Sequence, residues 1–116
     1  MSKLTIALDI MGGDHGPPVI LPAAVKAIQL HPDVHFTLCG DEDTIKAGIQ
    51  PLTNAERNRV TIVHCSQVVE MGEAPTSALR NKKDSSMRRV IELVESGEAN
   101  ACVSAGNTGA LLTLSF

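Results

Sequence analysis

Three polar clusters contain the residue types and spacings that could do chemistry in this chain. The clearest cluster is SAGNTG at residues 104–109, which combines side-chain hydrogen-bond donors with two glycines that let a ligand approach the backbone. Its members are Ser104, Gly106, Asn107, Thr108 and Gly109. Because no acid separates this stretch from the apolar run that follows, the N–H groups at the start of a helix here would favour an anion. The alternative is that Ser104 or Asn107 only caps that helix.

The second cluster, RNKKDSSMRR at residues 80–89, is strongly basic in a chain whose formal net charge is -3. It holds five of the chain's 10 lysines and arginines. Arg80 and Lys82 precede Ser85 and Ser86, which we expect in the first turn of a helix. Cationic side chains and backbone N–H groups would then converge on one phosphate. The alternative is an ordinary solvated, charged surface.

The third cluster, LDIMGGDHGPP at residues 8–18, places glycines and prolines directly after an apolar run. Gly12, Gly13 and Gly16 allow a positive φ and a close approach of a ligand. The prolines donate no N–H, and the pattern matches neither GxGxxG nor a P-loop, so this stretch by itself is a poor phosphate cradle. Asp14 would repel a phosphate unless it is paired. The alternative is a tight turn in which Asp14 caps the next helix or accepts hydrogen bonds from loop amides.

Short apolar runs alternate with segments of helical period along the chain, a rhythm typical of an α/β fold with a mainly parallel sheet. We expect strands at residues 3–10, 34–39, 59–65 and 100–105, and helices at 19–30, 42–50, from 84 to a stop at Gly97, and at 106–116. The three clusters follow the first, third and fourth strands, and ligands bind beyond the carboxyl ends of parallel strands. We also expect a right-handed crossover to return the fourth strand to the same sheet edge as the third.

Composition narrows the classes of protein to which the chain can belong. A length of 116 residues with 43% hydrophobic residues suits one folded domain with an aliphatic core. Only 2% of the residues are aromatic and the net charge is negative, so we expect no nucleic-acid partner. No run is long and apolar enough for a signal peptide or a membrane span, which favours a cytosolic chain. The apolar, uncapped last turn predicts a fragment of a longer protein.

The cysteines and histidines predict no redox or metal chemistry. Cys39, Cys65 and Cys102 lie in or at the ends of β-branched or apolar runs without a CxxC motif, so we expect reduced thiols that pack in the core. None of the four histidines combines with cysteine or carboxylate at a spacing typical of zinc ligands, so we predict no metal site. Asp41 follows the second strand, where a dinucleotide-binding fold holds the acid that binds a ribose.

Three stretches, ALDIMGGDHGP, APTSALRNKKDSSM and VSAGNTGALL, resemble in this order the N-terminal part of the PlsX family of bacterial acyl-ACP:phosphate acyltransferases. The resemblance implies a Rossmann-like α/β/α fold similar to isopropylmalate dehydrogenases and phosphotransacetylases. It implies that residues 1–116 are the N-terminal part of a single, truncated catalytic domain. It also implies a cytoplasmic homodimer that works at the membrane surface, upstream of a glycerol-3-phosphate acyltransferase.

The implied reaction moves a fatty acyl group from acyl-ACP to inorganic phosphate, with no cofactor and no covalent enzyme intermediate, and gives acyl phosphate for phospholipid synthesis. The candidate catalytic residues are then Asp14, Lys82 and Asn107. The candidate contacts to phosphate or substrate are Gly12, Gly13, Arg80, Ser85, Ser86, Ser104, Gly106, Thr108 and Gly109. Two rivals stay open: a nucleotide- or dinucleotide-binding module that uses Asp41, and a non-catalytic piece that binds acidic ACP through the basic cluster.

Overall fold

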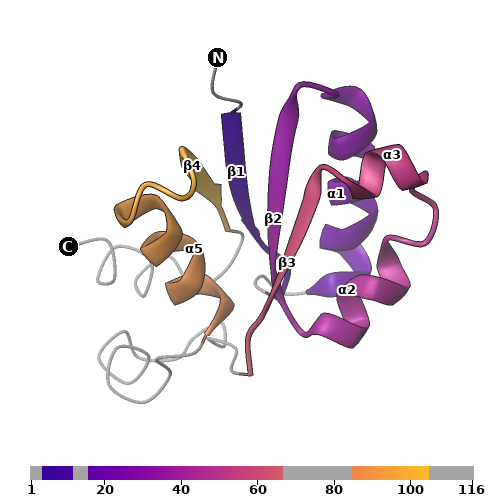
Figure 1. The fold of residues 1–116 in the computed structure, drawn as a ribbon. Coiled ribbons are helices and arrows are strands. Elements are labelled where there is room, and N and C mark those ends of the chain that lie inside the picture. The colour runs from indigo at the N-terminus through magenta and orange to yellow at the C-terminus, as the bar shows by residue number, and fades with distance from the viewer. Residues whose placement is uncertain (1–3, 12–15, 67–84, 105–116) are drawn as a thin grey trace.

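The computed structural model describes residues 4–11, 16–66 and 85–104, and Figure 1 shows them as a sheet with helices on both sides. Strands and helices alternate along these residues in the predicted α/β rhythm. In chain order the elements are β1 (Leu4–Asp9), α1 (Pro17–Leu30), β2 (Val34–Gly40), α2 (Glu42–Gly48), α3 (Asn54–Arg57), β3 (Val60–His64), α5 (Ser86–Glu95) and β4 (Ala101–Val103).

The four strands form one sheet in the order β3-β2-β1-β4. Every neighbouring pair is parallel, with Leu8 of β1 opposite Leu38 of β2 and opposite Val103 of β4. All carboxyl ends therefore lie at one edge of the sheet, as Figure 1 shows for β1 and β2. The predicted fold class, α/β with a mainly parallel sheet, is confirmed, and the arrangement is consistent with a Rossmann-like α/β/α fold.

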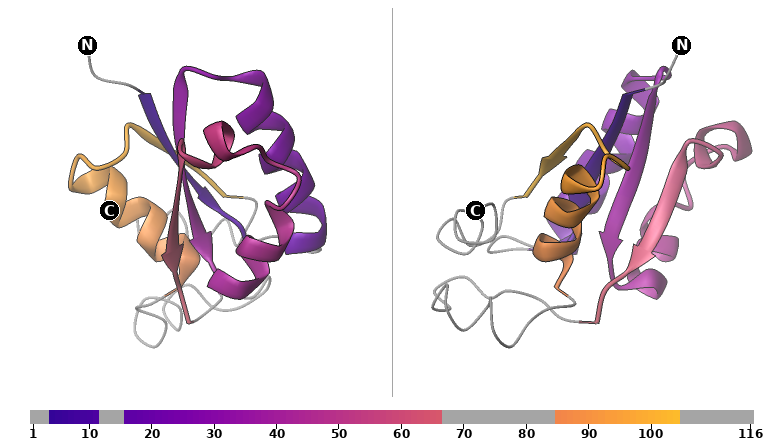
Figure 2. Two further views of the ribbon diagram at one scale, coloured as in Figure 1. Left: turned by 45° about the vertical axis from the view of Figure 1, so that its right-hand side comes forward. Right: turned by 60° about the vertical axis from the view of Figure 1, so that its left-hand side comes forward.

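The two faces of the sheet pack against different helices, as the right-hand view of Figure 2 shows. Because side chains alternate along a strand, Leu8, Phe36 and Leu38 face α1 and α2, where they join a buried aliphatic cluster. Ala7 and Cys39 point to the other face and pack against Met87, Val90 and Ile91 of α5. Asp9 shares this second face, because it follows Ala7 by two residues in β1.

Glycines with positive φ lie where two helices begin and end. Gly16 has φ 59° and precedes α1, whose first two residues are prolines that need no N–H partner at a helix start. The sequence analysis predicted this use of Gly16. Gly97 has φ 83° and follows the end of α5, as expected for a glycine beyond a helix C-terminus.

The observed element bounds differ from the predicted ones mostly at their ends. The first helix begins at Pro17 rather than residue 19, and the second ends at Gly48 rather than residue 50. The short helix α3 was not predicted; Thr53 and Glu56 close it with a reciprocal capping box. The fourth strand was predicted at residues 100–105, and among the described residues 85–104 it comprises Ala101–Val103. The helix predicted at 106–116 lies outside the described residues.

The expectation that the fourth strand returns to the same side of the sheet as the third strand is wrong. β4 lies beside β1, so β2 and β1 separate it from β3. The backbone explains this placement: Asn100, just before β4, donates its N–H to the carbonyl oxygen of Thr5 at 2.8 Å, and its side-chain oxygen accepts from Thr5 N at 2.8 Å. These bonds join the start of β4 to the free edge of β1.

Candidate functional site

The carboxyl end of β1 carries a buried carboxylate, Asp9, that the sequence analysis did not select. Only 2% of its surface is exposed. Asp9 ends β1, follows the apolar run Ile6–Leu8 and comes shortly before the loop with Gly12 and Asp14. A buried carboxylate requires hydrogen-bond donors, because its transfer from water into the protein interior is unfavourable without them. The signal available in the sequence was this single acid at the end of the strand.

Within residues 4–11, 16–66 and 85–104, donors from three separate segments reach the carboxylate of Asp9. Met11 in the loop after β1 donates its backbone N–H to Oδ1 at 3.1 Å. Ser86, the first residue of α5, donates its hydroxyl to the same oxygen. Ser104, directly after β4, donates its hydroxyl to Oδ2 at 2.6 Å. Asp9 therefore joins the ends of β1 and β4 to the beginning of α5.

Sheet register explains why Ser104 reaches Asp9. β1 and β4 pair in parallel, and their last paired residues are Leu8 and Val103. Asp9 and Ser104 each come directly after this last pair, so they lie side by side although 95 positions separate them in the chain. The SAGNTG cluster thus begins at the carboxyl edge of the sheet, beside the strand that leads into the glycine-rich cluster.

The start of α5 is held by two adjacent serines that are both buried. Ser85 is the N-cap, and its hydroxyl oxygen accepts the backbone N–H of Arg88 at 3.2 Å. Ser86 follows as the first helical residue and donates to Asp9. Because the first N–H groups of a helix have no intrahelical partner, this end of α5 suits an anion. Ser85 and Ser86 were both predicted to contact phosphate or substrate, but their contacts in the fold differ: Ser85 caps the helix and Ser86 attaches it to β1.

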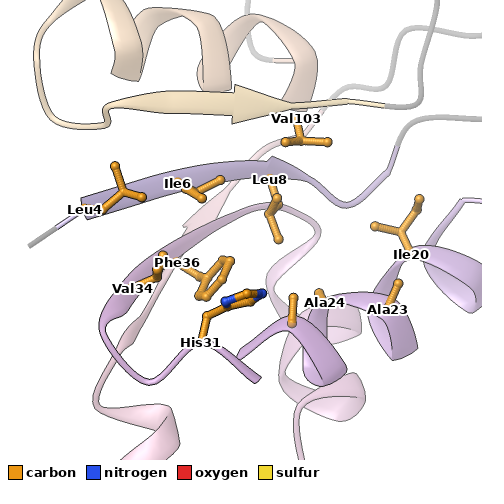
Figure 3. A pocket seen from close by; sticks show the side chains of 11 residues that line it. Leu4, Ile6, Leu8, Ile20, Ala23, Ala24, His31, Val34, Phe36 and Val103 are labelled. Atoms are coloured by element: carbon orange, nitrogen blue, oxygen red, sulfur yellow. The ribbon is translucent and has the colours of Figure 1, made fainter. Parts of the chain in front are cut away.

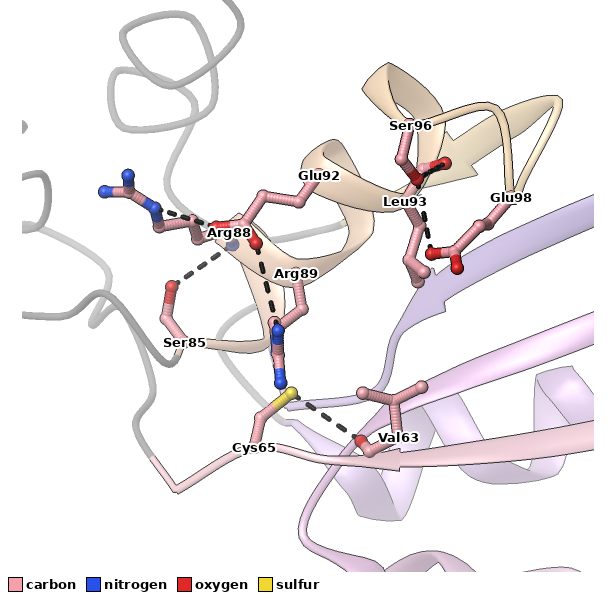
Figure 4. A network of polar contacts seen from close by, with 9 residues as sticks. All are labelled: Val63, Cys65, Ser85, Arg88, Arg89, Glu92, Leu93, Ser96 and Glu98. Atoms are coloured by element: carbon pink, nitrogen blue, oxygen red, sulfur yellow. Dashed lines mark hydrogen bonds and ion pairs between the residues drawn. The ribbon is translucent and has the colours of Figure 1, made fainter.

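Part of the basic cluster is engaged in ion pairs along α5. Arg88 Nε lies 3.0 Å from Glu92 Oε1, and Arg89 Nη1 lies 3.8 Å from Glu92 Oε2 (Figure 4). Figure 4 also shows Arg89 extending toward Cys65, while Arg88 points away from the sheet. These two arginines therefore share one carboxylate. The phosphate-binding prediction rested on Arg80 and Lys82, which lie outside the described residues.

Most of the predicted site residues fall in the parts of the chain that the structure does not describe. These are Gly12, Gly13, Asp14, Arg80, Lys82, Gly106, Asn107, Thr108 and Gly109. Ser85, Ser86 and Ser104 are described, and the last two meet at Asp9. Phosphate binding by any of the predicted residues stays a prediction. What the structure adds is that the segments before and after them converge at one edge of the sheet.

Cys39 and Cys65 lie next to this edge as buried cysteines outside any disulfide, as predicted. Cys102 also forms no disulfide and is half-buried. The pKa of Cys39 is raised far above its usual value, first by a hydrogen bond with Cys65 and then by burial. Burial also raises the pKa of Cys102. Since the thiolate is the nucleophilic form, neither environment activates a cysteine for covalent catalysis.

The rival ribose-binding acid, Asp41, has a local role in the fold. It is the N-cap of α2, and its Oδ2 accepts from the backbone N–H of Thr44 at 3.0 Å and from the Thr44 hydroxyl at 2.6 Å. These bonds hold the pKa of Asp41 below its usual value. Helix capping therefore accounts for the contacts of this acid with the described residues.

An apolar groove of about 500 Å³ lies on the opposite face of the sheet from Asp9, beside α1 (Figure 3). Strand residues such as Leu8 and Val103 and helix residues such as Ile20 point into it, and His31 brings the only polar side chain among its lining residues. This lining suits hydrocarbon and offers no cluster of donors for phosphate.

No group of three or more His, Cys, Asp and Glu side chains in residues 4–11, 16–66 and 85–104 could hold a metal ion. None of the helices formed by those same residues is long and apolar enough to cross a membrane.

Comparison with known proteins decides the family. Residues 4–116 match the family described as fatty acid synthesis protein. The chain belongs to this family. The match confirms the resemblance to the PlsX family that the three sequence stretches indicated.

Relatives within the fatty acid synthesis protein family carry the name phosphate acyltransferase. The chain is 52% identical to the phosphate acyltransferase of Halorhodospira halophila over 111 residues, which covers 96% of this chain and 32% of the relative. It is 53% identical to that of Pseudoalteromonas atlantica over 114 residues, covering 98% and 33%. The match to the Methylococcus capsulatus protein is 51% over 110 residues, covering 95% and 32%. The chain thus spans about one third of the length of these relatives.

Proposed function

We propose that the full-length protein transfers a fatty acyl group from acyl-ACP to inorganic phosphate and releases acyl phosphate and ACP. The printed name of the relatives, phosphate acyltransferase, supports an acyl transfer that involves phosphate. The observation that carries the proposal is the convergence at Asp9 of the start of α5 with Ser104. This convergence brings the flanks of the basic cluster and of SAGNTG to the edge where parallel sheets bind ligands.

The reaction needs a pocket that binds phosphate beside a thioester. A phosphate oxygen attacks the thioester carbonyl carbon, a C–O bond forms, the C–S bond breaks, and the ACP thiol leaves with a proton. Cations and N–H donors would hold the phosphate, and further donors would stabilise the oxyanion that develops on the carbonyl. Alignment of the two substrates would supply most of the remaining acceleration, so no covalent intermediate on the protein is needed.

The residues proposed for these roles are those predicted from sequence. Lys82 and Asn107 would contact phosphate and the developing oxyanion, and Asp14 is the third catalytic candidate. Arg80 and the glycines of SAGNTG would line the phosphate pocket. The Arg88 N–H at the α5 start already donates to Ser85, and the Ser86 hydroxyl donates to Asp9, so the other backbone N–H groups of the first turn would face the same anion.

We also propose the oligomeric state, location and partner enzyme that the resemblance to the PlsX family implies. The full-length protein would be a cytoplasmic homodimer, peripherally associated with the membrane, whose acyl phosphate is consumed by a glycerol-3-phosphate acyltransferase. Residues 1–116 would form the N-terminal part of one α/β catalytic domain. We expect residues 1–116 alone to be inactive, because they span only about a third of the relatives' length. Acyl phosphate made by purified residues 1–116 would contradict this expectation.

The decisive experiment measures the release of ACP thiol by the purified full-length protein, with and without inorganic phosphate. The proposal expects thiol release that depends on phosphate and an equal amount of acyl phosphate, trapped as the hydroxamate. Thiol release that ignores phosphate would instead indicate a thioesterase. ACP binding without turnover would indicate the non-catalytic alternative. Saturable binding of a nicotinamide nucleotide that Asp41→Ala abolishes would support the nucleotide-binding rival.

A further inference from the structure

The carboxylate of Asp9 is suited to hold other groups in place. It is 2% exposed, and donors approach both of its oxygens. A negative charge repels phosphate, so Asp9 has no favourable direct role toward that substrate. Its contacts instead reach three segments, each of which borders a stretch that the proposed function places around phosphate.

The hydroxyls of Ser86 and Ser104 also indicate that Asp9 holds other segments in place. A hydroxyl has one proton to donate, and Ser86 and Ser104 both direct it to Asp9. These protons are therefore not available to phosphate while the bonds exist. Ser86 and Ser104 were predicted as phosphate contacts, and their observed contacts make them anchors of the polypeptide at the edge of the sheet.

A carboxylate fits this position better than its closest neutral analogue. Asp offers only acceptor oxygens, so Met11 N–H and both hydroxyls find acceptors at once. Asn offers one acceptor oxygen and one donor NH2 group; Met11 N–H and Ser86 both donate to Oδ1, so the oxygen should stay on their side and the NH2 should face Ser104. The Ser104 hydroxyl would then exchange a charge-assisted bond for a weaker neutral one, so the amide loosens this attachment without removing the side chain.

We propose that Asp9 is a positioning residue, which fixes the start of α5 and the segment after β4 through Ser86 and Ser104 and thereby determines the affinity for phosphate. This inference rests on the proposed function, which names phosphate as the acyl acceptor. Helix N–H groups bind an anion only when they point at it, and a displacement of about 1 Å can change a rate by about a hundredfold. Loss of one anchor therefore reduces the binding of phosphate more than that of the acyl donor, because the anchored segments border the stretches proposed to hold phosphate.

The test is steady-state kinetics of Asp9→Asn in the full-length protein, with phosphate and acyl-ACP varied in turn. We expect the KM for phosphate to rise at least about tenfold, while the KM for acyl-ACP changes by less than about threefold. Two controls match the substitution. Asp33→Asn makes the same chemical change at an exposed turn before β2, and Val90→Ala lowers stability on α5 without removing a hydrogen-bond donor to Asp9. Both controls should keep the KM for phosphate of the unaltered protein.

A double-mutant cycle tests whether Asp9 acts through the serines. Ser104→Ala should raise the KM for phosphate in the unaltered protein but have little further effect in Asp9→Asn. Asp9→Glu, which keeps the charge and both acceptors, should recover part of the affinity. Additive effects of Asp9→Asn and Ser104→Ala, or a KM for phosphate in Asp9→Asn equal to that in Val90→Ala, would overturn the inference and leave the proposed function intact.

A failure of the proposed function can be distinguished from a failure of the positioning role of Asp9. If the unaltered protein shows no phosphate-dependent thiol release, that function is wrong, and hydrogen exchange of the same variants decides the positioning role. Asp9→Asn should then accelerate exchange at the first turn of α5 and just after β4 more than Val90→Ala does at equal global stability. Equal exchange in the two variants would overturn the inference on structural grounds alone.

Discussion

Ser104 Oγ lies 2.6 Å from Asp9 Oδ2, although 95 positions separate the two residues in the chain. The contact exists because β4 pairs with β1 rather than with β3. It places the beginning of SAGNTG beside the strand that leads into the glycine-rich loop, and Ser86 brings the end of the basic cluster to the same carboxylate. Predictions about the phosphate pocket follow from this convergence.

Lys82→Ala and Asn107→Ala should each reduce kcat/KM for phosphate at least about tenfold in the full-length protein. A charge-assisted contact to phosphate contributes about 1.5 to 3 kcal/mol, whereas an exposed surface lysine contributes close to zero. Steady-state kinetics with phosphate varied at saturating acyl-ACP measures the effect. Lys26→Ala, an exposed lysine on α1, is the matched control. A Lys82→Ala protein that behaves like the control would make the basic cluster a surface feature.

Serine at Cys39, Cys65 or Cys102, one at a time, should leave turnover in the folded protein. The raised pKa of Cys39 keeps its thiol protonated, and direct attack by phosphate needs no cysteine nucleophile. Placing a hydroxyl at buried Cys39 should lower the free energy of unfolding by about 1 to 3 kcal/mol. Thermal melting and thiol-release assays of the three variants separate the two effects. A variant that stays folded yet loses all turnover would argue against direct attack.

Arg59→Ala should lower the free energy of unfolding by about 2 kcal/mol, as expected for loss of hydrogen bonds from a charged donor. The Arg59 guanidinium donates to the carbonyl oxygens of Ile28 at 2.8 Å, His31 at 2.8 Å and Val34 at 3.1 Å. It thereby joins the end of α1 to the start of β2, and its charge complements the helix C-terminus.

The control for Arg59 is Arg57→Ala, an exposed arginine two residues earlier that donates to the Gln50 carbonyl oxygen at 2.8 Å. Urea denaturation of both variants gives the comparison. We expect Arg57→Ala to cost about 0.5 kcal/mol or less, because an exposed donor exchanges its partner for water. Equal losses in the two variants would show that the triple contact of Arg59 adds no stability.

Asp41→Asn should reduce the melting temperature at neutral pH but not in strong acid. Hydrogen bonds from the Thr44 hydroxyl and backbone N–H lower the pKa of Asp41 from its ordinary value of 3.8. A lowered folded-state pKa adds stability above pH 3.8, and this contribution disappears as the pH falls through the folded-state value. Melting temperatures from pH 6 downward measure it. Thr44→Val, which removes the hydroxyl donor, should lose part of the same stability, and a pH-independent difference would contradict the assignment.

Local sequence patterns were sufficient for the identity of most elements. The periodic spacing of Met87, Val90 and Ile91 predicted α5, and all three are buried against the sheet. Gly16 was expected to allow a positive φ and has one. The short helix α3 was missed because it buries no side chain, so no apolar period marks it. The capping-box pair Thr53 and Glu56 was its available signal.

By itself, the sequence determined the α/β class, the positions of the four strands, the cysteines without disulfides and the family, because periodicity and long motifs are properties of neighbouring residues. Only the tertiary structure decided which strand lies beside which and what Asp9 contacts. Parallel pairing joins segments through backbone hydrogen bonds that any residue can make, so local patterns do not show that β4 joins β1. From sequence alone, an acid at the end of a strand is taken for a loop residue. Only the structure shows that Ser86 and Ser104 donate to it, because those donors come from distant parts of the chain.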